Sequence, residues 1–281
     1  MDSLILEEFI DNALKEDVAD GDHTSLSTIP ADAKGKAKLL IKENGIVAGV
    51  NVALAIFKRV DSELKAEVLI KDGSEVKIGD IVLYISGSVR SILTAERLVL
   101  NTMQRMSGIA TTTHKIVQLI ASTGTKVLDT RKTTPNLRFL EKEAVKIGGG
   151  VNHRFGLYDM ILIKDNHVDY AGGISQAINA AKEYLQQKGL QIPIEIEVRN
   201  LEELKAVMNT GTVDRILLDN FTFGGLKAAV ALIDGKYITE ASGGITEENV
   251  LDYAKCGVNY VSMGALTHSV KSLDMSLKAV I

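Results

Sequence analysis

The N-terminal third of the chain combines two spacings of apolar residues. Across residues 4–16 they recur at helical intervals, which predicts an amphipathic helix. Residues 35–50 alternate apolar with polar positions and turn at Asn44-Gly45, so we expect two strands there. Residues 51–60 have a helical pattern, and strand-like runs broken by Gly–Asp turns predict a hairpin module over residues 64–87.

The next predicted helix has Thr94 as its N-cap, runs through Met106 and stops near Gly108. We expect the glycine to break the helix and to mark the end of a first domain. The segment D-G-D-H-T-S at residues 20–25 is predicted to be a loop.

From about residue 109 onward, helical segments alternate with short apolar strands. This alternation predicts parallel strands joined by crossover helices, which is an α/β architecture. The predicted strands cover residues 127–128, 160–163, 194–198, 215–218, 237–241 and 260–263. The predicted helices cover residues 111–122, 171–188, 201–209, 224–233 and 247–256, and residues 266–281 form a short amphipathic tail.

Composition narrows the class of protein. The chain has 281 residues, 46% of them hydrophobic, which suits one large α/β barrel or two domains. Its formal net charge of -4 argues against a general nucleic-acid binder. The single Cys256 cannot form an internal disulfide and fits a reducing compartment. No signal peptide is evident and no apolar run approaches the ~20 residues of a membrane span, so we expect a cytoplasmic protein.

Polar residues follow or line the predicted strands of the second half of the chain. The carboxyl ends of the strands are where a parallel α/β barrel gathers its chemistry, so we predict an active site at the barrel mouth. The residues concerned are Arg131, Lys132, Lys164, Asp165, Glu195, Glu197, Asp219, Ser242, Gly243, Gly244 and Gly264.

The basic residues among them suit an anionic ligand, because guanidinium and ammonium groups bind carboxylates and phosphates. His153 and Arg154 add to this set, since they follow three glycines close to a predicted turn. The glycines at 243–244 and 264 allow backbone N–H groups to approach a phosphate at a helix start, although a simple turn also uses glycine. The pattern predicts a ligand with several negative charges.

Glu195 and Glu197 share one face of a strand because they are two residues apart. Adjacent carboxylates inside a barrel require cations, sugar hydroxyls or a metal, and Arg131, Lys164 or Mg²⁺ can neutralise them. A structural ion-pair layer is the alternative. Asp219 has the same two interpretations, as a ribose or metal ligand or as a cap on the following loop.

The order of motifs along the chain resembles that of the quinolinate phosphoribosyltransferase family. The motifs are L-N-T-M-Q-R-M-S-G-I-A-T, D-T-R-K-T-T-P, G-G-G-V-N-H-R, L-I-K-D-N-H, E-I-E-V, I-L-L-D-N, E-A-S-G-G-I and M-G-A-L-T-H-S. The resemblance implies an N-terminal α/β sandwich over residues 1–107, onto which the tail 266–281 packs. It also implies an open α/β barrel over residues 108–265, and the family barrel has seven strands where six are predicted here.

The reaction that the resemblance implies is phosphoribosyl transfer from phosphoribosyl pyrophosphate to quinolinate, with Mg²⁺ as cofactor. Decarboxylation gives nicotinate mononucleotide, pyrophosphate and CO₂, a step of de novo NAD biosynthesis. The resemblance further implies at least a dimer in which Arg105 reaches the neighbouring site. Spacing alone gives Arg105 no role.

The resemblance also assigns roles to single residues. The quinolinate carboxylates are surrounded by Arg105, Arg131, His153, Arg154 and Lys164. Pyrophosphate or ribose is faced by Lys132 and Lys164. Ribose hydroxyls and Mg²⁺, directly or through water, are held by Glu197 and Asp219. The 5-phosphate is held by Ser242, Gly243, Gly264 and His268. The catalytic set is Lys132, Lys164, Glu197 and Asp219.

Three other functions remain open from the residues. A same-fold relative associated with molybdenum transport would use a different acceptor. A Schiff-base aldolase of the barrel class would use Lys164 as its nucleophile. A non-catalytic phosphate-binding protein would bind phosphoribosyl pyrophosphate without turnover.

Overall fold

The computed structural model describes residues 3–280, and the chain divides into two compact units. Unit 1 comprises Met1–His114, Thr134–Gly149 and Ser269–Ile281, and unit 2 comprises Lys115–Thr133 and Gly150–His268. The division expected from the sequence places a boundary near residue 107 and returns the tail 266–281 to the first domain. In the structure, the chain leaves unit 1 after residue 114, returns to it for residues 134–149 and ends in it from residue 269 onward.

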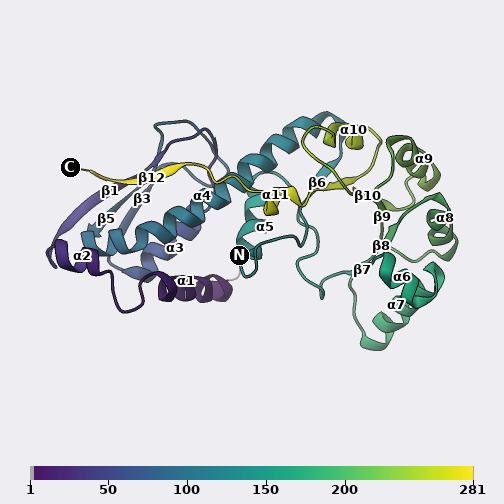
Figure 1. Ribbon diagram of the computed structural model, residues 1–281, viewed down its shortest axis with the longest axis horizontal. Coiled ribbons are helices and arrows are strands. Elements are labelled where there is room, and N and C mark those ends of the chain that lie inside the picture. Colours follow the sequence, from purple (N-terminus) through teal and green to yellow (C-terminus); the bar gives the residue numbers. More distant parts are fainter. Residues whose placement is uncertain (1–2, 281) are drawn as a thin grey trace. The chain divides into compact units, whose positions relative to one another are not determined.

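Unit 1 is built on a four-stranded antiparallel sheet with the order β12-β1-β5-β3 (Figure 1). A separate two-stranded sheet joins β2 to β4. The elements are α1 (Ser3–Asp17), α2 (His23–Thr28), β1 (Lys34–Ile41), β2 (Gly45–Ile46), α3 (Val50–Val60), β3 (Lys65–Val68), β4 (Glu75–Val76), β5 (Ile81–Ser88), the first part of α4 (Val89–Ile120), α5 (Arg138–Ile147) and β12 (Met275–Val280).

Alternation along β1 buries Ala37, Leu39 and Ile41 on one face of this sheet. The last strand of the chain, β12, pairs with β1 and places Leu277 opposite Leu39. The C-terminal tail therefore ends as an edge strand of unit 1 rather than as an extension of unit 2.

Two predictions about the long helix α4 are wrong. It begins at Val89 rather than at Thr94, and it passes through Gly108 without a break to end at Ile120. Gly108 serves close packing instead, because a Cβ there would collide with the carbonyl oxygen of Lys271. The glycine is required by the neighbouring C-terminal segment, which a local reading of the helix does not reveal.

Other local predictions for unit 1 also need correction. The loop expected at residues 20–25 contains the start of α2, where the Asp22 side chain caps the helix by accepting from Ser25 N at 3.0 Å. The strands on either side of Asn44-Gly45 do not pair with each other, since β1 and β2 belong to different sheets. Helix α5 lies in a segment for which the pattern predicts no element.

Unit 2 is a six-stranded parallel sheet with the order β6-β11-β10-β9-β8-β7, and its helices lie outside the arc of strands (Figure 1). The predicted α/β barrel is confirmed. The strands are β6 (Lys126–Leu128), β7 (Ile161–Ile163), β8 (Ile194–Val198), β9 (Arg215–Asp219), β10 (Ile238–Ser242) and β11 (Tyr260–Ser262). The helices after the end of α4 are η1 (Ala121–Thr123), α6 (Asp165–Ala171), α7 (Ile174–Lys188), α8 (Leu201–Thr210), α9 (Phe223–Ile233), α10 (Val250–Ala254) and α11 (Ala265–His268).

A seventh strand position is present as one residue. Val151 forms an isolated parallel bridge with Leu128 beside β6. Among residues 3–280, strands β6 and β7 do not pair, so the barrel is open at this point. Within the same residues, no helix has the length and apolar character needed to cross a membrane.

Candidate functional site

The two glutamates of β8 have different environments on the same inner face of the sheet. Glu195 and Glu197 alternate with Ile194, Ile196 and Val198, as the strand period predicts. Glu195 is completely buried, whereas Glu197 is partly exposed nearer the carboxyl end of the strand. Each of the two alternatives raised by the sequence therefore describes one of the glutamates, an ion-pair layer for Glu195 and a position at the barrel mouth for Glu197.

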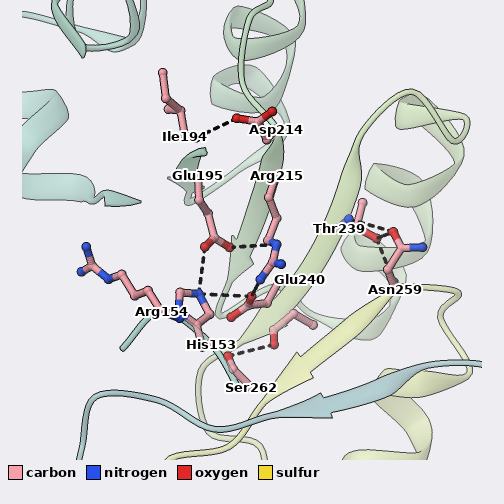
Figure 2. A network of polar contacts seen from close by, with 11 residues as sticks. His153, Arg154, Ile194, Glu195, Asp214, Arg215, Thr239, Glu240, Asn259 and Ser262 are labelled. Carbon is pink, nitrogen blue, oxygen red and sulfur yellow. Dashed lines mark hydrogen bonds and ion pairs between the residues drawn. The ribbon is translucent and has the colours of Figure 1, made fainter. Parts of the chain in front are cut away.

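Glu195 belongs to a buried charge cluster with His153, Arg215 and Glu240 (Figure 2). The Nε2 atom of His153 lies 2.8 Å from Oε2 of Glu195 and 3.5 Å from Oε2 of Glu240. Arg215 Nη1 donates to Glu240 Oε2 at 3.0 Å, and Arg215 Nε lies 4.0 Å from Oε1 of Glu195. The cation that balances Glu195 is therefore Arg215, not Arg131 or Lys164 as the sequence suggested.

The sequence analysis gave no role to Arg215 or Glu240, although their positions in the strands indicate which face they occupy. Both lie in predicted strands, and the strand period places Arg215 on the same face as Asp219 and Glu240 on the same face as Ser242. What the sequence lacks is the register between strands, which pairs Glu195 with Arg215 and brings Glu240 beside them.

Burial shapes the protonation of this cluster. Burial raises the pKa of Glu195, with the positive charge of Arg215 opposing the shift. Burial, together with the charge of Glu195, raises the pKa of Glu240 from 4.5 to about 7. Two carboxylates so close together cannot both remain ionised cheaply in a dry interior, so Glu240 carries a proton through most of the acidic range.

His153 is fixed on both sides of its ring. Its backbone N–H donates to Asp129 Oδ1 at 2.8 Å, while the backbone N–H of Arg154 donates to ring Nδ1 at 2.7 Å. A ring nitrogen that accepts a hydrogen bond carries no proton, so the remaining proton lies on Nε2 and points to Glu195. The imidazole is neutral in this arrangement, and both nitrogens are engaged within the protein.

Arg154 leaves the cluster and turns its guanidinium away from it, as Figure 2 shows. Its Nη1 donates to the carbonyl of Met160 at 3.2 Å. Burial lowers the pKa of Arg154, and the positive charge of Arg131 lowers it further. Arg131 and Arg154 therefore place two guanidinium groups near each other, an arrangement that suits an anion with two carboxylates.

A second group of polar side chains lies at the ends of β8, β9 and β10. Asp219 Oδ1 accepts from the Ser242 hydroxyl at 2.8 Å, and Asp219 Oδ2 accepts from the Asn220 amide at 2.5 Å. Burial raises the pKa of Glu197, and the negative charge of Asp219 raises it further, whereas Lys164 acts in the opposite direction. The structure thus brings together four residues predicted from the sequence: Lys164, Glu197, Asp219 and Ser242.

A third group links the ends of β6 and β11. The Thr267 hydroxyl donates to the Lys132 carbonyl at 2.8 Å. A Cβ on Gly264 would lie 2.9 Å from Lys132 Cδ and 3.0 Å from His268 Cδ2, so both side chains pass directly over this glycine. Three predicted site residues from two different groups, Lys132, Gly264 and His268, are therefore close together in the fold.

The glycines were expected to precede a helix or a helix turn, and they differ in how closely they do so. Gly264 directly precedes the short helix α11, but α10 starts only at Val250, six residues after Gly244. Gly243 has a φ of 96°, and a Cβ there would collide with the Asn220 side chain. It is required because Asn220 approaches the backbone closely beside Asp219.

Arg105 is the one predicted site residue that belongs to unit 1. From α4 it donates to Glu141 Oε1 at 2.6 Å and to the Thr134 hydroxyl at 2.8 Å, and Glu141 is buried on α5. The guanidinium lines a cavity of about 400 Å³ with mainly apolar walls that include Phe9 and Leu98. A buried carboxylate thus orients an arginine that is itself partly exposed.

Comparison with known proteins gives consistent results. Residues 22–107 match the quinolinate phosphoribosyl transferase N-terminal domain, and residues 109–278 match the quinolinate phosphoribosyl transferase C-terminal domain. A chloroplastic nicotinate-nucleotide pyrophosphorylase (carboxylating) of Oryza sativa subsp. japonica is 46% identical over 97% of this chain and 77% of its own length. A probable nicotinate-nucleotide pyrophosphorylase (carboxylating) of Bacillus subtilis is 40% identical over 99% of this chain and 94% of its own. The crystal structure of NadC from Streptococcus pyogenes superposes with a TM-score of 0.94 at 39% identity, covering 100% of this chain and 99% of that one.

Proposed function

The chain belongs to the quinolinate phosphoribosyltransferase family, and we propose that its reaction takes place at the carboxyl ends of strands β6 to β11. The reaction is the decarboxylating transfer of a phosphoribosyl group to quinolinate in de novo NAD biosynthesis. The observation that carries the proposed site is that Arg131 lies near enough to Arg154 for its positive charge to lower the pKa of Arg154. Two neighbouring guanidinium groups suit a pyridine with two carboxylates.

The mechanism follows from where charge appears during the reaction. The pyridine nitrogen attacks the anomeric carbon of the ribose as pyrophosphate leaves, and negative charge builds on the leaving group. Lys132 and Lys164 supply fixed positive charge to that group, which favours the transition state without reorganisation. The ring nitrogen becomes cationic and stabilises the electron pair that stays on ring carbon 2 as the adjacent carboxylate departs as CO₂. That carbon then takes a proton from water, which gives nicotinate mononucleotide. Holding two anionic reactants together is the main task of the side chains.

The acidic pair Glu197 and Asp219 fits a magnesium ion. Both offer carboxylate oxygens, the ligands that Mg²⁺ prefers, and the negative charge of Asp219 already raises the pKa of Glu197. A cation between them would relieve this repulsion. Bound Mg²⁺ would supply additional positive charge for the pyrophosphate. Carboxylate oxygens of Glu197 and Asp219 that do not bind the metal ion would accept hydrogen bonds from the ribose hydroxyls.

The phosphate end of phosphoribosyl pyrophosphate fits the opposite part of the sheet. Ser242 ends β10 and Gly243 follows it, while Gly264 and His268 follow β11. We assign the 5-phosphate to the backbone N–H groups and the imidazole at these two strand ends. The closeness of Lys132 to Gly264 supports this assignment, because it would give the phosphate a neighbouring cation. With the phosphate placed there, Arg131 and Arg154 are available to bind the carboxylates of quinolinate.

An incubation of the purified protein with quinolinate, phosphoribosyl pyrophosphate and Mg²⁺ tests the function. We expect stoichiometric CO₂, pyrophosphate and nicotinate mononucleotide. Product formed only with other pyridine or anionic acceptors would favour the relative associated with molybdenum transport. A lysine adduct trapped by borohydride in the presence of a sugar phosphate would favour the aldolase. The cytoplasmic location remains a prediction from the sequence.

The proposed oligomer is at least a dimer in which Arg105 of one copy serves the site of the other. Its support is that Arg105 is anchored by buried Glu141 and keeps part of its guanidinium exposed. Mixing inactive Arg105→Ala and inactive Lys132→Ala proteins, after exchange of subunits, should restore about a quarter of the wild-type activity, because half of random dimers are hybrids with one intact site. Mixtures that stay inactive although hybrids form would refute a shared site.

A further inference from the structure

Three members of the buried cluster of His153, Glu195, Arg215 and Glu240 have no assigned role in the reaction, namely Glu195, Arg215 and Glu240. All four side chains are buried or nearly so, and side-chain exposures are 7% for His153, 0% for Glu195, 15% for Arg215 and 1% for Glu240. Placing four ionisable groups in a barrel interior is expensive unless their charges balance. An arrangement of apolar residues would fill the same space at lower cost, so the cluster calls for a reason.

We propose that Glu195, Arg215 and Glu240 form a positioning cluster that holds His153, and through it Arg154, in the orientation that binds a carboxylate of quinolinate. The inference rests on the proposed placement of quinolinate at Arg154. It adds a supporting layer beneath His153 and Arg154, which the family resemblance places around the quinolinate carboxylates.

Two successive hydrogen bonds connect Glu195, through the ring of His153, to the backbone of Arg154. Glu195 accepts from His153 Nε2, which leaves Nδ1 as the acceptor for the backbone N–H of Arg154 at 2.7 Å. Asp129 fixes the same turn by accepting from the His153 backbone. Rotation of the imidazole would break both ends of this chain, so the orientation of His153 determines where the Arg154 backbone lies.

Charge balance explains why the cluster contains these residue types. With Glu195 ionised, Arg215 positive, Glu240 protonated and His153 neutral, the net charge is zero. Arg215 Nε and Glu195 Oε1 have no hydrogen-bond partner among the described residues, and they face each other at 4.0 Å. Arg215 therefore serves Glu195 as a counter-charge and Glu240 as a hydrogen-bond donor.

The proton on Glu240 is the one that a change of pH is expected to remove from the cluster. The groups that face Glu240 are Glu195 on β8, Arg215 on β9, His153 beside β6, and Ser262 on β11. Tyr260 on β11 covers Arg215 with its ring at 4.8 Å, and Arg154 influences Glu195 from outside the cluster. Loss of the Glu240 proton leaves a buried negative charge next to His153 Nε2. A second proton on His153 would have to occupy Nδ1 and would break the bond from Arg154.

A divalent cation is the competing occupant, because ligand atoms of His153, Glu195 and Glu240 lie within 4.8 Å of one another. Arg215 argues against it. Its guanidinium already donates to Glu240 and faces Glu195, so an ion at the centre of the cluster would lie against a fixed positive charge. The geometry is that of a closed ion-pair layer.

The test compares variants by their KM for each substrate. Arg215→Met should raise the KM for quinolinate by about tenfold, the size expected when a charged hydrogen-bond network is broken. The KM for phosphoribosyl pyrophosphate should change less than twofold. The double variant Arg215→Met with Glu195→Gln restores zero net charge and should recover most of the quinolinate KM. Equal changes in both KM values, or no recovery in the double variant, would overturn the proposal.

Thr239→Val provides the matched structural control. Thr239 is a buried polar residue on β10 adjacent to Glu240, and its hydroxyl bonds with Asn259 on the opposite side of the strand (Figure 2). It should lower the melting temperature without a change in the quinolinate KM. A KM change as large as that of Arg215→Met would mean that any damage to the core has this effect, and the cluster would have no special role.

Glu240→Gln keeps the test decisive if Arg215→Met does not fold. The amide mimics the protonated acid at every pH, so the quinolinate KM of this variant should be flat across pH 6–8, where that of the wild type rises. An identical pH profile in both proteins contradicts the proposal. Arg154→Ala tests the substrate placement separately from the positioning role. An unchanged quinolinate KM in this variant would mean that quinolinate does not bind at Arg154, and the positioning role would then be wrong as well. The reaction itself is tested by product formation.

Discussion

The inner face of unit 2 carries two charged layers that differ in their access to solvent. In the buried layer, Glu195 and Glu240 are matched by Arg215 and by a ring nitrogen of His153. In the layer at the barrel mouth, Glu197 lies near another acid and Arg154 lies near another arginine. The buried layer balances its charges within a closed cluster, whereas at the mouth Glu197 has both an acid and Lys164 as neighbours, and Arg154 has both an arginine and Asp159.

The difference teaches how one strand can serve both stability and function. Two glutamates separated by a single residue on β8 take opposite roles because one is sealed and one is open. Charges in a dry interior must be balanced within the protein, since a solitary buried charge is costly. At the mouth, solvent screens the repulsion until a substrate or a metal ion replaces the water.

The largest effect is expected at the acidic pair of the mouth. Asp219→Asn and Glu197→Gln each remove one charge from the proposed magnesium ligands, so kcat/KM should fall on the order of 10²-fold or more. The concentration of Mg²⁺ needed for half-maximal rate should rise in the same variants. A fall in rate at an unchanged Mg²⁺ requirement would assign these acids to the ribose alone.

An intermediate effect is expected at the arginine pair. Arg131→Ala removes a charged hydrogen bond worth about 1.5–3 kcal/mol, so quinolinate binding should weaken tenfold to a hundredfold. Titration calorimetry with quinolinate measures this directly. Arg59→Ala, at an exposed ion pair with Asp11 in unit 1, is the matched control and should bind normally. Wild-type affinity in Arg131→Ala would exclude the carboxylate assignment.

The smallest effect concerns stability and appears only as pH changes. The pKa of Glu240 is raised from 4.5 to about 7, so the folded protein holds this proton more tightly than the unfolded chain. Its stabilising contribution is complete below about pH 4.5 and is lost as the pH rises to about 7, by about 3 kcal/mol. Denaturant unfolding at pH 5 and pH 8 should show a smaller decline for Glu240→Gln than for the wild type. Parallel declines would mean that Glu240 is ionised throughout.

Prediction from the sequence succeeded where a signal is local and repeated. The six strands of unit 2 were expected at nearly their observed bounds, because short apolar runs alternate with helical segments. The shared face of Glu195 and Glu197 followed from strand period alone. The helix break at Gly108 was wrong because the reason for that glycine lies in the segment near Lys271, more than 160 residues away in the sequence.

By itself, the sequence determined the α/β class, the family and the set of charged residues at the strand ends, since these depend on local period and on motifs. Tertiary structure alone decided which charges meet. Strand register set Arg215 beside Glu195, and the return of β12 to unit 1 required a glycine inside a helix. Pairing across a sheet depends on the packing of residues far apart in the chain, and no local pattern records it.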